Sequence, residues 1–342
     1  MEISGVDNAK FGPLAPRFPL NLVHPLGPLF RHLPLAARRH LLFMHASRRI
    51  GNFRNPTTFT EKMQWRIIND RRPLLSWTTD KLAQKSYVNQ LKTLHTELAE
   101  LSVPETYWIG QCVDELRQLA TNLPARYVIK PNHSSGRFLA INSDLATVDW
   151  NAVERVASSW VRRDEEELVL GHWPYGQARH LLIAEERIGS AETISSEMRG
   201  WVFDGVLRQL TRYDVGLRTS ATYNRTFNRI SSSRTIEVPL DQNNHFDTLI
   251  PEAKERLVKM MEIIGGPFDH MRVDVFVEGN QFIFNELSPF AFGGLAHYPN
   301  PDFDTERGSF WSLPELTADD PTASAWEALL KESPRGTRQA SR

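Results

Sequence analysis

The chain has 342 residues, of which 41% are hydrophobic and 24% are charged, as is typical of a globular protein. Its net charge is −1 and its pI is about 6.8, which disfavours a partner bound through bulk positive charge, such as nucleic acid. Cys112 is the single cysteine, so an intrachain disulfide and a cysteine-based zinc site are both excluded. Met1 to Lys10 lack the apolar core of a signal peptide and no apolar stretch is long enough to span a membrane, so we expect a cytoplasmic location.

The first part of the chain predicts an arm followed by helices. Residues 1–55 are rich in proline and irregular, with one helical run near 33–50. The next helix has Thr58 or Thr60 available as its cap. A further helix is expected after Asp80.

The middle of the chain alternates strands, loops and helices. Strands are predicted at 126–131 and 137–141 around a polar loop at 132–136, followed by a helix over 144–163 and a strand at 181–184.

The last third opens with a hairpin. Residues 198–210 form it around an Asp-Gly turn. Residues 212–247 are polar and are expected to form a mobile loop region, and 251–264 a helix. The final thirty residues predict a short helix at 325–330 and a disordered tail.

The strongest chemical signal is a second hairpin over 271–287, joined by a turn at 278–280. A three-residue loop there would place Arg272 opposite Glu286, with Asp274 one diagonal step away on the same face. The other side chains expected on this face are Phe276, Phe282 and Phe284.

Two carboxylates on an apolar face repel unless a cation neutralises them. A hard divalent ion such as Mg²⁺, held by Asp274 and Glu286 and completed by phosphate oxygens, would do so. The alternative is a cross-strand ion pair between Arg272 and Glu286, with Asp274 at an exposed edge. These residues alone support both interpretations equally.

Lys130 ends a strand immediately before a short polar loop. Its ammonium can reach phosphate oxygens, which the Ser134 and Ser135 hydroxyls and the loop amides can cover, and Gly136 permits the positive φ that such a loop needs. An ordinary turn is the alternative. The spacing of a Walker A loop is absent.

Taken in order, these segments resemble the ATP-grasp superfamily. The segments that carry the resemblance are the helix start at 79–82, Lys130 with its loop, the strand at 181–188, Arg199, Arg272 to Asp274, and Asn285 to Ser288. Residues 58–65 with Asp70, Asp80 and Lys81, together with Gly293 and Gly294, resemble more narrowly the TupA-like (teichuronopeptide-type) proteins. The similarity covers roughly residues 56–312.

The resemblance implies an α+β fold of the ATP-grasp type, in which two α+β lobes enclose the nucleotide behind a reduced N-terminal helical and irregular region. The expected division is an N-terminal arm at 1–80, a small lobe with the phosphate loop at 81–184, a large lobe with the metal site at 185–312 and a tail at 313–342.

The resemblance also implies roles for the nucleotide-binding residues. Lys81 and Lys130 resemble the lysines that hold the phosphates, and Ser134, Ser135 and Gly136 resemble the loop that covers them. Glu185 and Glu186 lie where the family recognises adenine, with Ile188 against the base and Glu192 a candidate for the ribose hydroxyls.

In the catalytic part, Arg199 resembles a contact to the γ-phosphate or acyl phosphate, and Arg272 the arginine that stabilises the tetrahedral intermediate. Asp274 and Glu286 resemble the metal ligands. Ser288 stands where many members carry a ligating Asn, so a second metal is expected to bind more loosely. The implied cofactors are ATP and one or two Mg²⁺, for which Mn²⁺ can substitute.

The activity implied is an ATP-dependent ligation of a carboxylate to an amine through an acyl phosphate, with small-molecule carboxylate and amine substrates. A kinase of the same fold and a non-catalytic partner in polysaccharide assembly are the alternatives, and a homodimer is left open. The residues do not name the substrates. Five arginines are candidates for gripping an anionic one, with a solvated loop equally supported: Arg212, Arg218, Arg225, Arg229 and Arg234.

Overall fold

The computed structural model describes residues 4, 6, 27–134, 136–144, 146–161, 165–189, 196–214, 219–232, 237–238, 249–316, 328, 331 and 333. Over these residues, no helix combines the length and the apolar composition needed to cross a bilayer. Of the predicted short helix at 325–330 only Ala328 is described, and it is helical; most of the tail lies outside the described residues.

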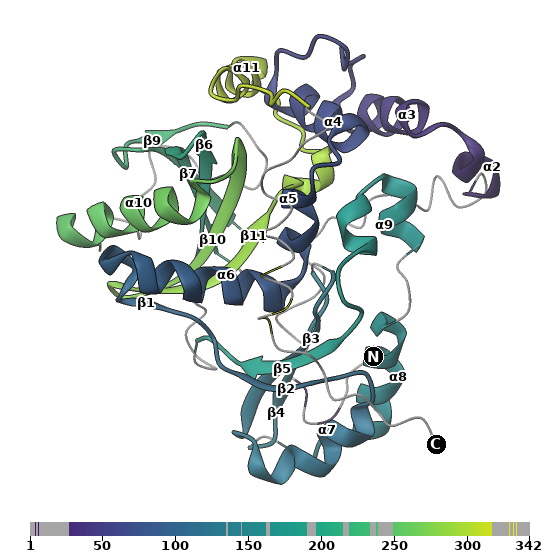
Figure 1. Cartoon of the computed structure of the whole chain (residues 1–342), viewed down its shortest axis with the longest axis vertical. Coiled ribbons are helices and arrows are strands. Elements are labelled where there is room, and N and C mark those ends of the chain that lie inside the picture. The colour runs from purple at the N-terminus through teal and green to yellow at the C-terminus, as the bar shows by residue number, and fades with distance from the viewer. Residues whose placement is uncertain are drawn as a thin grey trace.

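Two sheets organise the chain (Figure 1). The larger has seven strands in the order β1-β11-β10-β6-β7-β8-β9. Their bounds are β1 Leu101–Ser102, β6 Ser196–Phe203, β7 Val206–Asp214, β8 Thr219–Asn224, β9 Arg229–Ile230, β10 His270–Glu278 and β11 Gln281–Ser288. The pairings are antiparallel except that of β1 with β11.

One face of this large sheet is covered by two helices, α6 (Lys81–Leu94) and α10 (Pro251–Gly265), which lie across it in Figure 1. The apolar core lies between them and the sheet, where Tyr87 of α6 and Met261 of α10 pack with Val273 and Val275 of β10. The opposite face of β10 therefore carries Arg272, Asp274 and Phe276, because successive side chains alternate across a strand.

The smaller sheet has the order β2-β5-β3-β4, with β2 Thr106–Gly110, β3 Arg126–Pro131, β4 Leu139–Asn142 and β5 Leu182–Glu186. Its own core is formed with α7 (Val113–Leu119) and α8 (Trp150–Val161). The predicted strand, loop and returning strand are confirmed, whereas the following helix begins at Trp150 and not at residue 144.

The remaining helices form a third group beside the large sheet (Figure 1). They are α2 Gly27–His32, α3 Leu35–Ser47, α4 Phe59–Asn69, α5 Pro73–Ser76, α9 Glu165–Leu170 and α11 Pro301–Ser309. Thr58 caps α4. Its hydroxyl accepts a hydrogen bond from the Glu61 amide, and the Glu61 carboxylate accepts one from the Thr58 amide. Phe59 packs in a core with Trp201 and Trp311, which fixes this group to the large sheet.

The prediction of a mobile loop over 212–247 is wrong for the residues that the structure describes there. This region contains the end of β7 and all of β8 and β9, which extend the large sheet by two strands. Polar side chains misled the prediction, because Ser220 and Thr222 of β8 are buried.

The β10–β11 hairpin differs from prediction in two compensating ways. Glu278 pairs directly with Gln281, so the turn has two residues and not three. Farther along, Val275 pairs with Phe284 but Asp274 pairs with Glu286, which leaves a β-bulge at Asn285. The two one-residue shifts keep both carboxylates on one face, but they bring Asp274, and not Arg272, directly opposite Glu286.

The same register corrects the prediction about the aromatic side chains. Phe282 and Phe284 pair with Val277 and Val275, so they lie on the face covered by α6 and α10 and belong to its core. Phe276 alone of the three shares the face of Asp274. The carboxylate face is therefore more polar than the sequence predicted.

Because the bulge holds one extra residue, deleting Asn285 should give a regular strand in which Phe284 and Glu286 keep their faces. We expect this deletion to leave a folded protein, destabilised by about 1.5–3 kcal/mol through loss of one hydrogen bond to a charged group. Deleting Ile283 instead turns neighbouring apolar side chains to the wrong face, at about 3–5 kcal/mol for each misplaced aromatic. Thermal unfolding followed by circular dichroism checks both, and equal damage by the two deletions would contradict the bulge assignment.

Candidate active site

The polar face of the large sheet brings charged side chains together in rows. Asp274 lies between Glu286 of β11 on one side and Arg199 of β6 on the other. Thr211 of β7 continues the row. Directly paired residues project to the same face, so this row presents two carboxylates beside an arginine.

Arg272 contacts both carboxylates. Its Nε donates to Asp274 Oδ1 at 2.8 Å and its Nη2 to Asp274 Oδ2 at 2.5 Å. Nη2 also donates to Ser288 Oγ at 2.9 Å and to Glu286 Oε1 at 3.5 Å. Arg272 therefore contacts Asp274 foremost, which differs from the predicted ion pair with Glu286 because the bulge moved the register. Asp274 is fully buried, whereas the Glu286 side chain is 22% exposed.

Arg199 is fixed by residues that the sequence did not single out. Its Nε donates to Glu197 Oε2 at 2.7 Å, and its guanidinium lies 4.5 Å from the ring centre of Tyr213. The other Glu197 oxygen accepts from Asn285 Nδ2 at 2.6 Å. The bulge thus has a consequence for the site, because it turns Asn285 toward Glu197. The spacing Glu197-x-Arg199 on a strand was the available signal, since residues two apart share a face.

Lys81 enters the site from the first turn of α6. Asp80 caps this helix by accepting from the Ala83 amide at 2.9 Å, and Arg179 Nη2 holds the same carboxylate at 2.6 Å. Lys81 Nζ donates to the carbonyl of Ser134 at 2.5 Å, which joins α6 to the loop after β3.

Lys130 of β3 lies against Glu185 of β5, and Lys85 of α6 binds the other Glu185 oxygen at 2.6 Å. Glu185 is 3% exposed. Its two carboxylate oxygens are occupied by lysines from two elements, Lys130 of β3 and Lys85 of α6. Lys85 was missed by the sequence analysis, although it lies four residues after Lys81 and so on the same side of the helix.

The electrostatics tie the two sheets together at Glu286. Burial would raise the pKa of this carboxyl, but Lys81, Arg272, Lys130 and Arg199 together hold it below its usual value. Burial lowers the pKa of Lys81 to about 8, with Lys130 adding to the shift and Glu286 opposing it. Burial and the neighbouring Glu197 raise the pKa of Asp274, against the opposing effect of Arg272.

The loop after β3 has the backbone that was predicted for it. Gly136 has φ of +70°, and a Cβ there would meet nothing within 4 Å. Ser134 is 2% exposed, and its hydroxyl is buried with no hydrogen-bond partner. Ser135 lies outside the described residues.

The residues predicted for the base are placed in part. Glu186 is exposed and accepts from the Glu105 amide at 3.2 Å, and Ile188 is half-buried just after β5. Glu192 lies outside the described residues.

Three of the five candidate arginines are described, and they lie away from the carboxylate face. Arg212 and Arg229 pair with Ala221 and Tyr223, two residues of the core under α10. Arg225 binds Glu262 of α10 at 3.0 Å. Arg218 and Arg234 lie outside the described residues.

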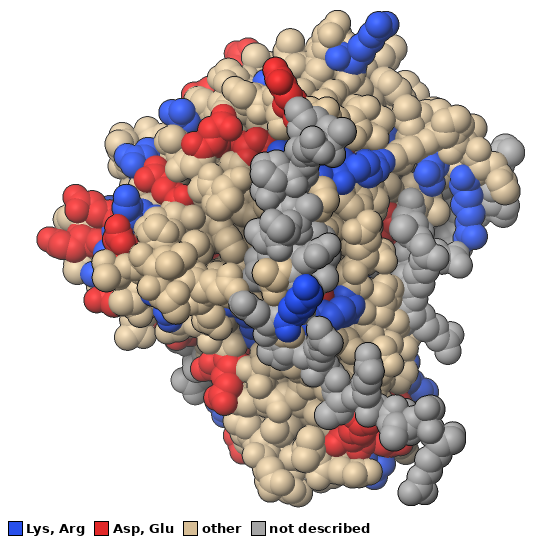
Figure 2. All heavy atoms as spheres, viewed as in Figure 1, with Lys and Arg blue, Asp and Glu red and all other residues tan. Residues whose placement is uncertain are grey.

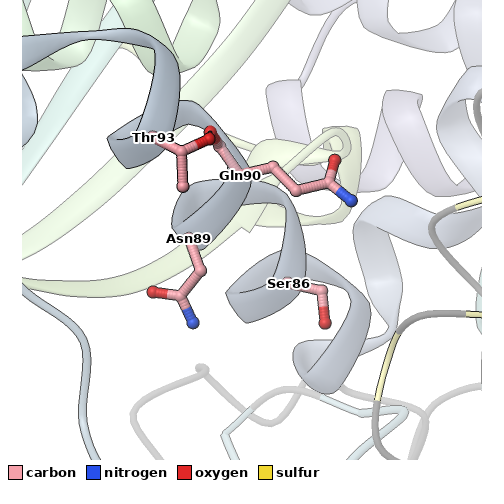
Figure 3. A pocket seen from close by; sticks show the side chains of 4 residues that line it. All are labelled: Ser86, Asn89, Gln90 and Thr93. Atoms are coloured by element: carbon pink, nitrogen blue, oxygen red, sulfur yellow. The ribbon is translucent and has the colours of Figure 1, made fainter.

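A shallow concavity lies elsewhere on α6. Ser86, Asn89, Gln90 and Thr93 line it and project together from one side of the helix (Figure 3). All four are neutral. Acidic and basic side chains are interspersed over the face drawn in Figure 2, so that face shows no field of a single sign.

A sequence profile described as TupA-like ATPgrasp matches residues 61–311, which is most of the chain and includes both sheets and the whole charged cluster. The chain belongs to the TupA-like ATP-grasp family. The α+β architecture and the ATP-grasp assignment made from the sequence are thereby confirmed. No curated protein matches the chain.

Solved structures show distant likeness to this family member. D-alanine–D-alanine ligase from Helicobacter pylori has a TM-score of 0.38 at 16% identity, covering 70% of this chain and 62% of that one. VanG D-Ala:D-Ser ligase from Enterococcus faecalis has a TM-score of 0.35 at 16% identity, and the match covers 69% of this chain and 62% of that one. The ATP-grasp ligase PsnB, complexed with a precursor variant, Mg and ADP, has a TM-score of 0.35 at 13% identity, and the match covers 77% of this chain and 61% of that one. The chain spans about three fifths of these proteins, and the family assignment rests on the sequence profile.

The depressed pKa of Lys81 makes its amine more reactive than a solvated lysine, which titrates at about 10.4. Acylation by a limiting reagent, read by mass spectrometry across pH 6–11, should give Lys81 a half-reaction pH near 8. The exposed Lys259 of α10 serves as the reference. Identical pH profiles for the two lysines would contradict the buried environment described for Lys81.

Proposed function

We propose that this protein is an ATP- and Mg²⁺-dependent ligase that joins a carboxylate to an amine through an acyl phosphate. One observation carries the proposal. Lys81, Lys130, Arg199 and Arg272, which come from four separate elements, each lower the pKa of Glu286 through their charge, and Arg272 Nη2 donates to its Oε1 at 3.5 Å. A polyphosphate beside a metal is the kind of ligand that such a cluster suits, and family membership favours ATP.

The donor set fits a hard divalent ion. Asp274 and Glu286 stand side by side as oxygen donors, with the Ser288 hydroxyl within 3.3 Å of Glu286 Oε1. Among the described residues, no group of three or more His, Cys, Asp or Glu could hold a metal alone. Mg²⁺ matches this, because it is usually held by one or two carboxylates together with water and phosphate oxygens. When bound, it would disperse negative charge on the phosphates.

The remaining chemistry is supplied by positioning. Lys81 and Lys130 would hold the phosphates, and the loop with Ser134 and Gly136 would cover them and exclude water. Arg199, fixed by Glu197, would face the transferring phosphoryl group. Arg272 would face the oxyanion that develops when the amine attacks the acyl phosphate, a role worth about 2.7–4 kcal/mol for one donor.

The contacts of Glu185 modify the predicted adenine site. Because Lys85 and Lys130 occupy both of its carboxylate oxygens, we propose that Glu185 mainly orients Lys130. Recognition of the base would then fall to the backbone after β5, near Ile188. The division of the chain into lobes and the number of metal ions remain predictions.

The two carboxylates should be required for activity for a common reason. Asp274→Asn and Glu286→Gln each remove a charge from the metal donors while nearly keeping size, and Asp274→Asn also removes one of the two oxygens that accept from Arg272. We expect Mg²⁺-dependent ATP turnover to fall at least about a hundredfold, the scale on which removal of one well-placed electrostatic group acts, with unchanged circular dichroism. Glu278→Gln, in the exposed turn of the same hairpin, is the matched control. Full turnover in both site variants would refute the metal assignment.

The ligase and kinase outcomes differ in their products. For a ligase, ADP release from a carboxylate and amine library should require both substrates, and hydroxylamine should trap the acyl phosphate as a hydroxamate detectable by mass spectrometry. A stable phosphorylated product formed without an amine would show a kinase. Absence of ADP release with every substrate pair would favour the non-catalytic alternative.

A further inference from the structure

Immediately after the site strand β11, the chain makes an unusual turn. Phe292, Gly293 and Gly294 have φ of +54°, +62° and +70°, so three consecutive residues are left-handed. Glycine adopts this region freely, but a residue with a Cβ does so at a cost in free energy. Such strain persists only where the surroundings hold it, and it concentrates at functional sites.

The surroundings that hold this turn come from distant segments. Arg39 of α3 donates to the Gly293 carbonyl at 2.9 Å, and His172 Nε2 lies 3.2 Å from the same oxygen. Gln64 of α4 donates to the Gly294 carbonyl. Arg39 also donates to Gln64 Oε1 at 2.7 Å, so the two side chains that donate to the turn carbonyls are hydrogen-bonded to each other.

Arg39 is the centre of this clamp. It is fully buried, and its third nitrogen donates to the Leu170 carbonyl of α9 at 3.0 Å. It lies before residue 61, where the family profile begins. Helix α3 is therefore tied to the end of the site strand through a planar fork of donors that lysine cannot reproduce.

The turn has no room for added atoms. A Cβ on Gly294 would stand 2.7 Å from Ile67 and 2.9 Å from Arg39 Nη2, and one on Gly293 would stand 3.1 Å from His172. The backbone therefore has one conformation available, which sets the direction of Phe292.

Phe292 is directed at the site. Its ring centre lies 5.6 Å from the Arg272 guanidinium carbon and 6.0 Å from the Trp201 ring. Asp274 fixes Arg272 through two hydrogen bonds, and the Phe292 ring adds a cation–π contact. A cation held by both contacts keeps its orientation when the charge on the neighbouring carboxylates changes.

We propose that Phe292 is a positioning residue for Arg272, and that the strained turn and its clamp by Arg39, Gln64 and His172 exist to hold it there. The proposal rests on the ligase function, in which Arg272 faces the developing oxyanion. It predicts an effect on the chemical step and none on nucleotide binding, because Lys81 and Lys130 hold the phosphates from other elements.

A double-mutant cycle tests this dependence. In the wild-type background, Phe292→Leu should lower kcat about fivefold, the scale of one partly desolvated cation–π contact, while Phe292→Tyr keeps the ring and should retain activity within twofold. In an Arg272→Lys background, Phe292→Leu should change kcat less than twofold further. Binding of a non-hydrolysable ATP analogue, measured by calorimetry, should not be changed by Phe292→Leu in either background.

A further variant tests the role of the clamp formed by Arg39, Gln64 and His172. Arg39→Lys should reproduce the kcat loss of Phe292→Leu and speed hydrogen exchange in peptides covering 289–296. Phe310→Leu is the matched control, because Phe310 contacts Arg208 outside the site at 5.5 Å. Equal losses from Phe292→Leu in both backgrounds, or weakened nucleotide binding, would overturn the positioning role. Absence of wild-type turnover would instead refute the proposed function, and the exchange measurement would still report on the clamp.

Discussion

The structure depends on the neutralisation of buried carboxylates where the two sheets meet. Glu185 in the small sheet is buried and Glu286 in the large sheet is partly buried, and the pKa of each carboxyl is held down by cations. Lys130 acts on both. Removing one partner of a buried ion pair costs several kcal/mol, so the helix that carries Lys81 and the strand that carries Lys130 are held in register with β11 by charge as well as by packing.

This arrangement also explains how a site can exist before its ligand arrives. The cations around Glu286 are satisfied for the moment by protein groups: Arg272 by Asp274, Arg199 by Glu197, Lys130 by Glu185. Lys81 contacts only a carbonyl among its described hydrogen bonds. In the proposed function, a phosphate group would therefore compete for Lys81 first, without breaking an ion pair.

Local sequence signals predicted a good part of this. Strand alternation and the Asp-Gly turn gave the β6–β7 hairpin, Thr58 gave the cap of α4, and period-two spacing put Asp274 and Glu286 on one face. The register was wrong because a bulge such as that at Asn285 depends on what the extra side chain contacts, here Glu197 of another strand. The strands β8 and β9 were missed because burial of Thr222 is decided by tertiary packing.

Contacts across long sequence separations could not be predicted from one chain. Lys85 meets Glu185 across 100 residues and Arg39 meets Gly293 across 254. No local pattern distinguishes such residues from solvated ones, because a lysine on a helix face or an arginine in a basic arm is usually exposed. The family resemblance supplied the candidate residues of the site, whereas the groups that contact them were found only from the structure.

The central claim is that Asp274 and Glu286 hold a divalent ion together with nucleotide phosphates. Electron paramagnetic resonance of Mn²⁺ with a non-hydrolysable ATP analogue tests it directly, by comparing protein-bound Mn²⁺ in the wild type with that in Asp274→Asn and Glu286→Gln. The account predicts a signal of bound Mn²⁺ in the wild type. In each variant the affinity for Mn²⁺ should be at least about tenfold lower, which corresponds to about 1.4 kcal/mol. Equal Mn²⁺ affinity in all three proteins would contradict it.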